Sequence, residues 1–434
     1  MSYLKKKAPA SSIQKEGIEF ASRDEISDLQ LRRLKETLNY VYRKVPHYRE
    51  EFDNLGIHPS DLKELGDIAK FPLTDKETLR SNYPFGMSGV NGDEIARVHA
   101  SSGTTGSPTI VTYTKRDLEI WSELVARSLR AGGVYPGDKV QIAFGYGLFT
   151  GGLGCHYGVE KLGAAAIPIS GGNTQKQLQI MNELRPDAIL GTPSYILKLL
   201  DDLRDLGVDP QETSLRTGVF GAEPWSEKMR SDLEQGFEID ATDIYGLSEI
   251  MGPGVAQECI ETKDGLTIWE DIFYPEILDT ETLEPVPDGE FGELVITPLA
   301  REASPTIRFR TRDITRLLPG TARSMRRLDR IVGRSDDMII IRGVNCFPSQ
   351  FGDLITSDDC FRSRFQCILT KRGHLDHLTL VVEHAPDRTS IEVDQATTRL
   401  RNRVKDKMGI SVEVDARSEV FLGQGKAKYF VDNR

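Results

Sequence analysis

Val140-Gln141-Ile142-Ala143-Phe144 is a short, mostly apolar run that leads directly into the glycine-rich stretch Gly145-Tyr146-Gly147. Further short apolar runs follow along the chain, at residues 164–169, 188–190 and 218–220. Stretches with apolar residues at helical spacing lie among them, at residues 118–129, 175–184 and 194–206. Short apolar strands that alternate with amphipathic helices are typical of a mostly parallel sheet covered by helices. The sequence therefore predicts a large N-terminal α/β domain with mostly parallel sheets and flanking helices.

The first eighty residues have a different pattern. Residues 18–80 are polar overall but carry leucines at helical spacing, including Leu31, Leu34 and Leu38, which predicts amphipathic helices. Near the end of this segment, Thr74 precedes Asp75, and we expect the Thr74 hydroxyl to cap the N-terminus of a short helix.

The pattern changes again after about residue 289. Strands are predicted at residues 293–297 and 307–313, and the charged stretch Ser335-Asp336-Asp337 separates two further apolar runs. Beyond this break the pattern predicts two strands, a helix and a last strand, at residues 365–370, 378–383, 396–408 and 410–414. We therefore expect a small α+β C-terminal domain. The expected limits are a large domain at 1–333, a hinge at 334–337 and a mobile C-terminal domain at 338–434.

Composition disfavours several classes of function. The 434 residues carry a formal net charge of −11, whereas general nucleic-acid and anionic-membrane binders depend on lysine and arginine. No apolar run approaches the roughly 20 residues that span a bilayer, and residues 1–17 lack the apolar core of a secretory signal. The five cysteines show no C-x-x-C spacing, so neither a disulfide framework nor a zinc site is expected. These features favour a reduced, cytoplasmic protein.

A hydroxyl-rich loop is predicted between the runs at 97–100 and 110–114, with the sequence Ser101-Ser102-Gly103-Thr104-Thr105-Gly106-Ser107-Pro108-Thr109. Glycines let successive N–H groups turn into one concavity, and the hydroxyls add donors, which together suit phosphate oxygens. Turn residues also explain the composition, so a plain polar turn is the alternative. The loop is not a Walker loop, because no Gly-Lys-Ser/Thr follows its glycines.

Several isolated residues suit a nucleotide site but also have simpler explanations. Glu249 could hold Mg²⁺ bound to phosphates or could be a solvated loop residue. Asp313 stands among three arginines and could pair with them or hold a ribose diol. Lys426, near the chain end, could reach an anion or stay solvated. His156 and Cys155 are interpreted as pocket-lining or buried residues, because no G-x-S-x-G elbow lies near them.

Taken jointly, the motifs of this chain resemble the adenylate-forming acid–CoA ligase superfamily and, within it, the phenylacetate–CoA ligase family. The similarity runs through nearly the whole chain. The stretches that carry it are, in order, Asn82-Tyr83-Pro84-Phe85-Gly86, His99-Ala100-Ser101-Ser102-Gly103-Thr104-Thr105-Gly106, Gly145-Tyr146-Gly147-Leu148-Phe149-Thr150-Gly151-Gly152-Leu153-Gly154, Phe220-Gly221-Ala222-Glu223-Pro224-Trp225, Asp243-Ile244-Tyr245-Gly246-Leu247-Ser248-Glu249, Tyr274-Pro275-Glu276, Arg310-Thr311-Arg312-Asp313, Gly333-Arg334-Ser335-Asp336-Asp337-Met338 and Arg342-Gly343-Val344-Asn345.

The resemblance implies three sets of binding residues. The phosphates of ATP would be wrapped by the loop residues Ser101, Ser102, Gly103, Thr104, Thr105 and Gly106. The adenine would be lined by residues of two strand ends, Ala222, Glu223, Pro224, Asp243, Ile244 and Tyr245. The pocket for the acid would be bordered by Tyr146, Phe149, Gly151, Cys155, Gly221 and Gly246.

The resemblance also implies individual catalytic roles. Ser248 would touch the α-phosphate, Glu249 would hold Mg²⁺ through ATP, and Asp313 would bind the ribose hydroxyls. Lys426 would swing in to stabilise charge on the carboxylate and the α-phosphate oxygens during adenylation. Asp336 would be the hinge of the small domain.

The implied reaction has two steps and uses ATP, Mg²⁺ and coenzyme A. The carboxylate of the acid attacks the α-phosphate of ATP to give acyl-AMP and pyrophosphate, and coenzyme A then displaces AMP. The small domain would rotate between the steps, and Arg334, beside the hinge, would contribute to the nucleotide site. Such steps need positioning and charge stabilisation more than a protein nucleophile. The expected partners are a small aromatic carboxylic acid and coenzyme A, with neither nucleic acid nor membrane; a homodimer is left open.

The chain departs from the family pattern at three places. Ser107 stands where a lysine is common, Cys155 where alanine is common, and Gln350-Phe351-Gly352-Asp353 where isoleucine and acids are typical. Cys155 would tighten the acid pocket, which favours a benzoate-like acid, hydroxy- or amino-substituted, over phenylacetate. The other two departures leave open transfer of the acyl group to an amine, a hydroxyl or a carrier protein. A third hypothesis is nucleotide binding without catalysis, against which the joint presence of Glu249, Asp313, Asp336 and Lys426 speaks.

Overall fold

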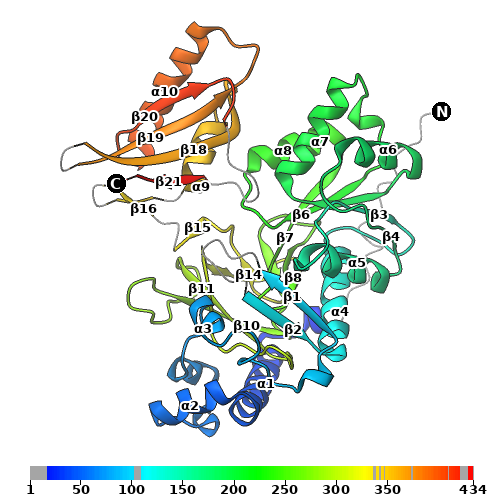
Figure 1. Cartoon of the computed structure of the whole chain (residues 1–434), viewed down its shortest axis with the longest axis vertical. Helices are drawn as coiled ribbons and strands as arrows, with labels where there is room; N and C mark the ends of the chain where they lie inside the picture. The colour runs from blue at the N-terminus through cyan, green and yellow to red at the C-terminus, as the bar shows by residue number, and fades with distance from the viewer. Residues whose placement is uncertain are drawn as a thin grey trace. The chain divides into compact units, whose positions relative to one another are not determined.

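The computed structural model describes residues 17–101, 109–335, 339–341, 344–346, 348–372, 375–408, 410–420 and 429–433 (Figure 1). The chain divides into two compact units. The first comprises Met1–Glu223 and Asp232–Arg330, and the second comprises Pro224–Ser231 and Ile331–Arg434. The domain limits expected at 333 and 338 stay predictions.

The first unit is built on a mixed sheet. Within the described residues this sheet has 9 strands, in the order β13-β14-β9-β8-β7-β6-β5-β3-β4. Their bounds are β3 Lys139–Ile142, β4 Ala165–Ile167, β5 Ala188–Gly191, β6 Thr217–Gly221, β7 Asp240–Leu247, β8 Gly252–Glu258, β9 Leu266–Ile268, β13 Leu317–Leu318 and β14 Arg327–Leu328. The pairs from β4 to β7 are parallel, as the sequence predicted, and those from β7 to β13 are antiparallel. The change of direction follows from the short β7–β8 turn, because such turns join only antiparallel strands.

Helices cover the parallel strands. The helix α4 (Lys115–Ala131) begins after the N-cap Thr114 and ends at Gly132, close to its predicted limits. It packs on α5 (Thr150–Leu162) and on β8. On the other side of the parallel strands lie α6 (Thr174–Leu184) and α7 (Pro193–Asp205), and α8 (Glu227–Phe237) precedes β7 (Figure 1). Among the described residues, no helix is both long enough and apolar enough to cross a bilayer. The α/β prediction for this part of the chain is confirmed.

The contact between α4 and α5 depends on glycine. A Cβ atom built on Gly154 would overlap the ring of Trp121, and one on Gly158 would overlap Val125. Any larger residue at these two positions of α5 would push the helices apart. Close helix packing therefore explains two glycines of α5, Gly154 and Gly158.

The N-terminal segment forms helices as expected, with the bounds α1 Arg23–Lys44, α2 Pro46–Leu55 and α3 Lys76–Ser81. The prediction that Thr74 caps α3 is wrong. Asp75 is the N-cap, and its carboxylate accepts a hydrogen bond from the Thr78 N–H at 2.9 Å. Thr74 is buried, and its hydroxyl donates to the Ile307 carbonyl at 2.6 Å. Both residue types are good caps, and burial of Thr74 decides between them.

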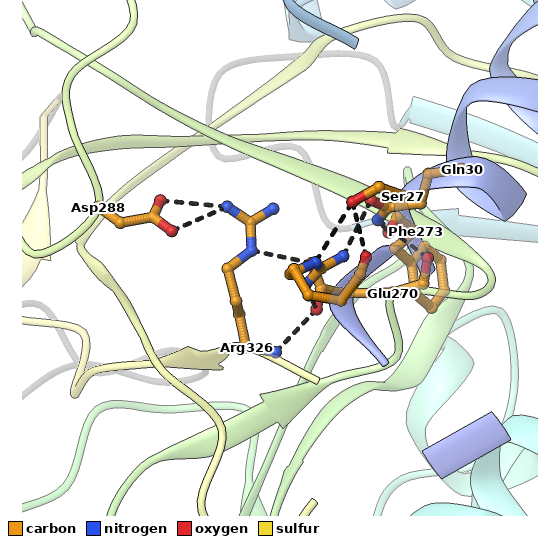
Figure 2. Close-up of polar contacts among 7 residues, drawn as sticks. Ser27, Gln30, Glu270, Phe273, Asp288 and Arg326 are labelled. Atoms are coloured by element: carbon orange, nitrogen blue, oxygen red, sulfur yellow. Dashed lines mark hydrogen bonds and ion pairs between the residues drawn. The ribbon is translucent and has the colours of Figure 1, made fainter. Parts of the chain in front are cut away.

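A buried carboxylate fastens α1 to the segment between β9 and the next sheet (Figure 2). Glu270 is 0% exposed and accepts hydrogen bonds from Arg23 at 2.6 Å and from Arg326 Nε at 2.9 Å. Arg326 also pairs with Asp288 at 3.1 Å, and the Gln30 amide donates to the Glu270 carbonyl at 3.0 Å. Burial raises the pKa of Glu270, but the two arginines outweigh it and hold that pKa below its ordinary value.

The hydroxyl-rich loop connects the two strands of a hairpin. β1 (Arg97–Ser101) pairs antiparallel with β2 (Thr109–Tyr113), and Ser101 lies opposite Thr109. This confirms the prediction of a loop between two strands, although residues 102–108 lie outside the described residues. A further antiparallel arrangement contains β10 (Phe273–Leu278), β11 (Gly292–Pro298) and β12 (Phe309–Thr315), in that order.

The second unit is the expected small α+β structure. Its described elements are β15 Gly333–Arg334, β16 Ile339–Ile341, β17 Val344–Cys346, α9 Pro348–Thr356, β18 Phe361–Arg372, β19 Leu375–His384, α10 Ser390–Met408, β20 Glu413–Arg417 and β21 Phe430–Asp432. Within the described residues, β20, β19, β18 and β21 form one sheet in that order. The strand predicted at residues 410–414 starts later, at Glu413, where pairing with β19 begins, and β21 is a further strand that the sequence pattern did not predict.

Candidate active site

Ser248 and Glu249 lie in the turn between β7 and β8, where the parallel half of the sheet ends. Ser248 is buried, and its hydroxyl is hydrogen-bonded to the Thr150 hydroxyl at 2.8 Å. Thr150 is the first residue of α5, so this contact joins the turn to the helix that carries Gly151 and Cys155. Ligands of such sheets collect at the carboxyl ends of parallel strands. The turn and the helix end are therefore placed where a ligand is expected.

The Glu249 carboxylate is buried without a full set of partners. Its side chain is 3% exposed, and the Lys76 ammonium lies 3.4 Å from Oε1. Among the described residues Oε1 has no hydrogen-bond partner, and neither does Thr306 Oγ1 beside the same small cavity. A buried carboxylate oxygen without a hydrogen bond is costly unless a cation or a ligand satisfies it. Because Mg²⁺ binds through one or two carboxylates plus phosphates and water, Glu249 fits this ion.

Tyr245 and Asp313 meet across two sheets. The Tyr245 hydroxyl, at the end of β7, donates to Oδ2 of Asp313 on β12 at 2.6 Å. The three arginines near Asp313 each pair with another carboxylate: Arg308 with Glu276, Arg310 with Glu293 and Arg312 with Asp75. The hydrogen bond orients the Asp313 carboxylate. Its role, as a diol-binding group or as an ion-pair partner, stays a prediction.

The predicted adenine residues of the first unit lie on neighbouring strand ends. Ile244 of β7 is opposite Gly221 of β6 in the sheet register. Ala222, directly after β6, has a φ of 68°, a left-handed conformation that is uncommon for residues with side chains. Glu223 accepts a hydrogen bond from the Ser194 N–H at 2.7 Å, at the N-terminus of α7. This hydrogen bond gives the Glu223 side chain a structural partner, the Ser194 backbone N–H. Burial raises the pKa of Glu223.

The residues predicted for the acid pocket lie on α5, just before it, and on the ends of β6 and β7. Gly151 and Cys155 are buried in α5, and Phe149 precedes this helix with 41% of its surface exposed. Burial raises the pKa of the Cys155 thiol to about 12, so the thiol stays protonated at neutral pH and is a weak nucleophile. The burial of Cys155 agrees with its interpretation as a buried residue.

The remaining pocket residues are held by their neighbours. The Tyr146 hydroxyl lies 3.3 Å from Nδ1 of His156, whose Nε2 lies 3.2 Å from Glu160. His156 therefore has a positioning contact on each ring nitrogen. A Cβ on Gly221 would overlap the Ile244 carbonyl, and the backbone of Gly252 leaves equally little room at Gly246. Both glycines are required by close backbone approach.

Two residues of this arrangement were missed by sequence reasoning. Thr150 could have been found from the sequence, because it is a hydroxyl-bearing residue at the end of a glycine-rich loop and at the start of a helix. Arg301 carried none, because its partners are distant in the chain. It is buried after β11 and donates to the Ser248 and Glu249 carbonyls at 3.4 and 3.3 Å.

Several predicted residues lie outside the described residues, namely Ser102, Gly103, Thr104, Thr105, Gly106, Asp336 and Lys426. Ser101 is the last residue of β1, while Pro224, Asp336, Lys426 and Arg334 belong to the second unit. The roles of all these residues stay predictions.

Comparison with known proteins decides the family. Residues 47–298 match the model described as AMP-binding enzyme, and residues 343–434 match the AMP-binding enzyme C-terminal domain. The chain belongs to the AMP-binding enzyme family. A phenylacetate-coenzyme A ligase of Aromatoleum evansii is 54% identical over 426 residues, which cover 96% of this chain and 97% of that protein. A phenylacetate-coenzyme A ligase of Escherichia coli (strain K12) is 55% identical over 401 residues, covering 92% of each chain.

The likeness extends to a solved structure. It is a 2-hydroxyisobutyryl-CoA ligase in the postadenylation state in complex with R3-HIB-AMP. Its TM-score is 0.91 at 27% identity, and the match covers 98% of this chain and 94% of that one. The protein is thus an AMP-forming acid–CoA ligase, an enzyme of a class that uses ATP, Mg²⁺ and coenzyme A.

Proposed function

We propose that this enzyme activates phenylacetate: phenylacetate, ATP and coenzyme A give phenylacetyl-CoA, AMP and pyrophosphate. The observation that carries the proposal is the identity of 54% and 55% with two phenylacetate-coenzyme A ligases over nearly their full lengths. Identity at this level, spread over both parts of the chain, supports the same substrate class as well as the same fold.

The nucleotide would be held by residues of the first unit. Asp313, oriented by Tyr245, would accept hydrogen bonds from the ribose hydroxyls. Ser248, fixed by Thr150, would donate to the α-phosphate, and residues 101–106 would surround the outer phosphates. When bound beside Glu249, Mg²⁺ would neutralise phosphate charge. These contacts would place the α-phosphate in front of the acid carboxylate, and positioning of this kind supplies much of the rate of such a reaction.

The second unit would serve both half-reactions. Lys426 would bring its ammonium to the carboxylate and α-phosphate oxygens while acyl-AMP forms, because a preorganised cation stabilises charge that develops in the transition state. Rotation about Asp336, with Arg334 beside it, would then withdraw Lys426 and open the site to the coenzyme A thiol. This use of one site for two steps is consistent with known domain closures.

The acid is tested by pyrophosphate release across phenylacetate, 4-hydroxyphenylacetate, benzoate, 2-hydroxybenzoate and 2-aminobenzoate. Phenylacetate should give the highest kcat/KM. The competing substrate is a benzoate-like acid, favoured by the buried Cys155 on the helix of the predicted pocket. A preference for benzoate would contradict the proposal and support tightening by Cys155, in which case Cys155→Ala should shift the preference toward phenylacetate.

Coenzyme A is favoured over other acceptors of the acyl group. The sequence departure at Phe351-Gly352, one reason to consider other acceptors, has a packing explanation. Phe351 is fully buried in the core of the second unit, and a Cβ on Gly352 would lie 3.0 Å from the Phe365 ring. Stoichiometric phenylacetyl-CoA formation on addition of coenzyme A would exclude the alternative acceptors, whereas accumulation of acyl-AMP would support them. A cytoplasmic location and a homodimer stay predictions.

A further inference from the structure

Arg301 holds the turn that carries Ser248 and Glu249 through its backbone. Its side chain is buried, and Nη1 donates to the carbonyls of Ser248 at 3.4 Å and Glu249 at 3.3 Å, and also to that of Ile250. One guanidinium group thus contacts three consecutive peptide units. The orientation of the whole turn is therefore tied to this side chain.

The same guanidinium reaches the hairpin of β1 and β2. Nη2 donates to the Thr112 carbonyl at 3.3 Å, and Cζ lies 4.6 Å from the ring centroid of Tyr113. The Tyr113 hydroxyl in turn donates to the Met251 carbonyl at 2.9 Å. Arg301 and Tyr113 together fasten the Ser248–Glu249 turn to β2, the strand that follows the predicted phosphate loop.

The charge of Arg301 lacks an acidic partner. In the part of the chain that the structure describes, no carboxylate pairs with it, and its Nε has no hydrogen-bond acceptor. Other buried arginines are paired, Arg308 with Glu276 at 2.9 Å and Arg323 with Glu19 at 2.6 Å. Burial of an unpaired charge is costly. A triphosphate bound at the neighbouring turn is an anion that would offset this cost.

We propose that Arg301 is a positioning residue for nucleotide binding, which fixes the Ser248–Glu249 turn against β2 and keeps an uncompensated positive charge beside it for a nucleoside triphosphate. This inference rests on the proposed function, because it takes the turn to be part of the ATP site. It concerns the binding of ATP and the adenylation step. The affinity for coenzyme A does not depend on it.

The test compares Arg301→Met and Arg301→Lys with the control Arg323→Met. Arg323 is also buried and forms ion pairs, with Glu19 and Glu261, so its loss also destabilises the fold. Calorimetric titration with MgATP, without any acid, should show affinity lowered about 10- to 100-fold in Arg301→Met, as for other residues that orient ligand-binding groups. The KM for ATP should rise with it, while the KM for coenzyme A stays unchanged. Arg301→Lys should recover part of the affinity, and Arg323→Met should bind MgATP as the wild type does.

Wild-type affinity for MgATP in folded Arg301→Met would overturn the inference and leave Arg301 a structural residue. If Arg301→Met does not fold, Arg301→Lys is the deciding variant, because a lysine ammonium cannot reach the Thr112 and Ile250 carbonyls together. Unchanged MgATP binding by Arg301→Lys would then overturn the inference. Failure of the wild type to activate phenylacetate would contradict the proposed function alone, since the titration requires neither acid nor acceptor.

Discussion

The Tyr245 hydroxyl donates a 2.6 Å hydrogen bond to the Asp313 carboxylate and so joins β7 of the central sheet to β12 of a second sheet. Tyr245→Phe removes this donor from the Asp313 carboxylate. We expect the KM for ATP to rise roughly 5- to 10-fold, the equivalent of about 1–1.4 kcal/mol for one hydrogen bond, with kcat nearly unchanged. Steady-state pyrophosphate release measures both constants. Tyr42→Phe is the matched control, because Tyr42 donates to Asp53 at 2.8 Å on the N-terminal helices; an equal effect in both variants would contradict a role in ATP binding.

Lys426→Ala should separate the two half-reactions. Acyl-AMP formation from acid and ATP is expected to fall about 10²- to 10³-fold, the usual loss on removal of a group that stabilises developing charge. Thioester formation from supplied phenylacetyl-AMP and coenzyme A should be far less affected. Rapid-quench measurement of each half-reaction checks this. Unchanged adenylation would show that Lys426 has been assigned wrongly, and Lys428 would be the next residue to test.

Ser107→Lys should restore a cation where relatives commonly have one. The KM for ATP is expected to fall about three- to tenfold, because a charge-assisted contact to phosphate would be gained. Ser107→Met adds length without charge and should not lower the KM. If both variants bind ATP as the wild type does, residue 107 lies outside the path of the phosphates.

Glu270→Gln should make stability less sensitive to acid. Because the pKa of Glu270 is held below its ordinary value in the folded protein, its ion pairs contribute fully above the unfolded-state pKa of about 4.3. That contribution is lost as pH falls through the folded pKa. The free energy of unfolding of the variant should be about 3–5 kcal/mol lower than that of the wild type at pH 7, because Arg23 and Arg326 lose the carboxylate that they share. Urea unfolding should show a smaller difference from wild type near pH 4. The control Glu50→Gln, at an exposed position of α2, should leave the free energy of unfolding unchanged at both pH values. An equal loss of stability at pH 7 and pH 4 for Glu270→Gln would contradict the role given to the Glu270 carboxylate.

Much of the fold was predictable, because the short apolar runs between residues 140 and 220 are typical of parallel strands buried on both faces. The antiparallel half of the sheet was not, since its direction depends on the turn at Ser248–Glu249 and not on composition. The N-cap of α3 could not be predicted from the sequence. Thr74 and Asp75 are adjacent and both are good N-cap residues, and only the burial of Thr74 decides between them.

Sequence reasoning named candidate site residues where a local motif singles them out, and it named none where a residue acts through contacts distant in the chain. Ser248, Glu249 and Asp313 stand in recognisable motifs. Ser248 and Glu249 lie in the turn between β7 and β8, and Asp313 lies in β12. Thr150 and Arg301 act through contacts that span 98 and 53 positions of the chain. No periodicity or spacing encodes such pairs, because they exist only after the sheets have assembled.

The interlocking of α4 and α5 has a consequence for the evolution and engineering of acid specificity. Where Gly154 meets Trp121 and Gly158 meets Val125, an exchange on one helix demands a compensating exchange on the other. Single substitutions in α5 are therefore tolerated chiefly at positions that already carry a side chain, and Cys155 is such a position. Divergence among related ligases should accumulate there first, and a designer who grafts α5 from a relative should transplant the facing turn of α4 with it.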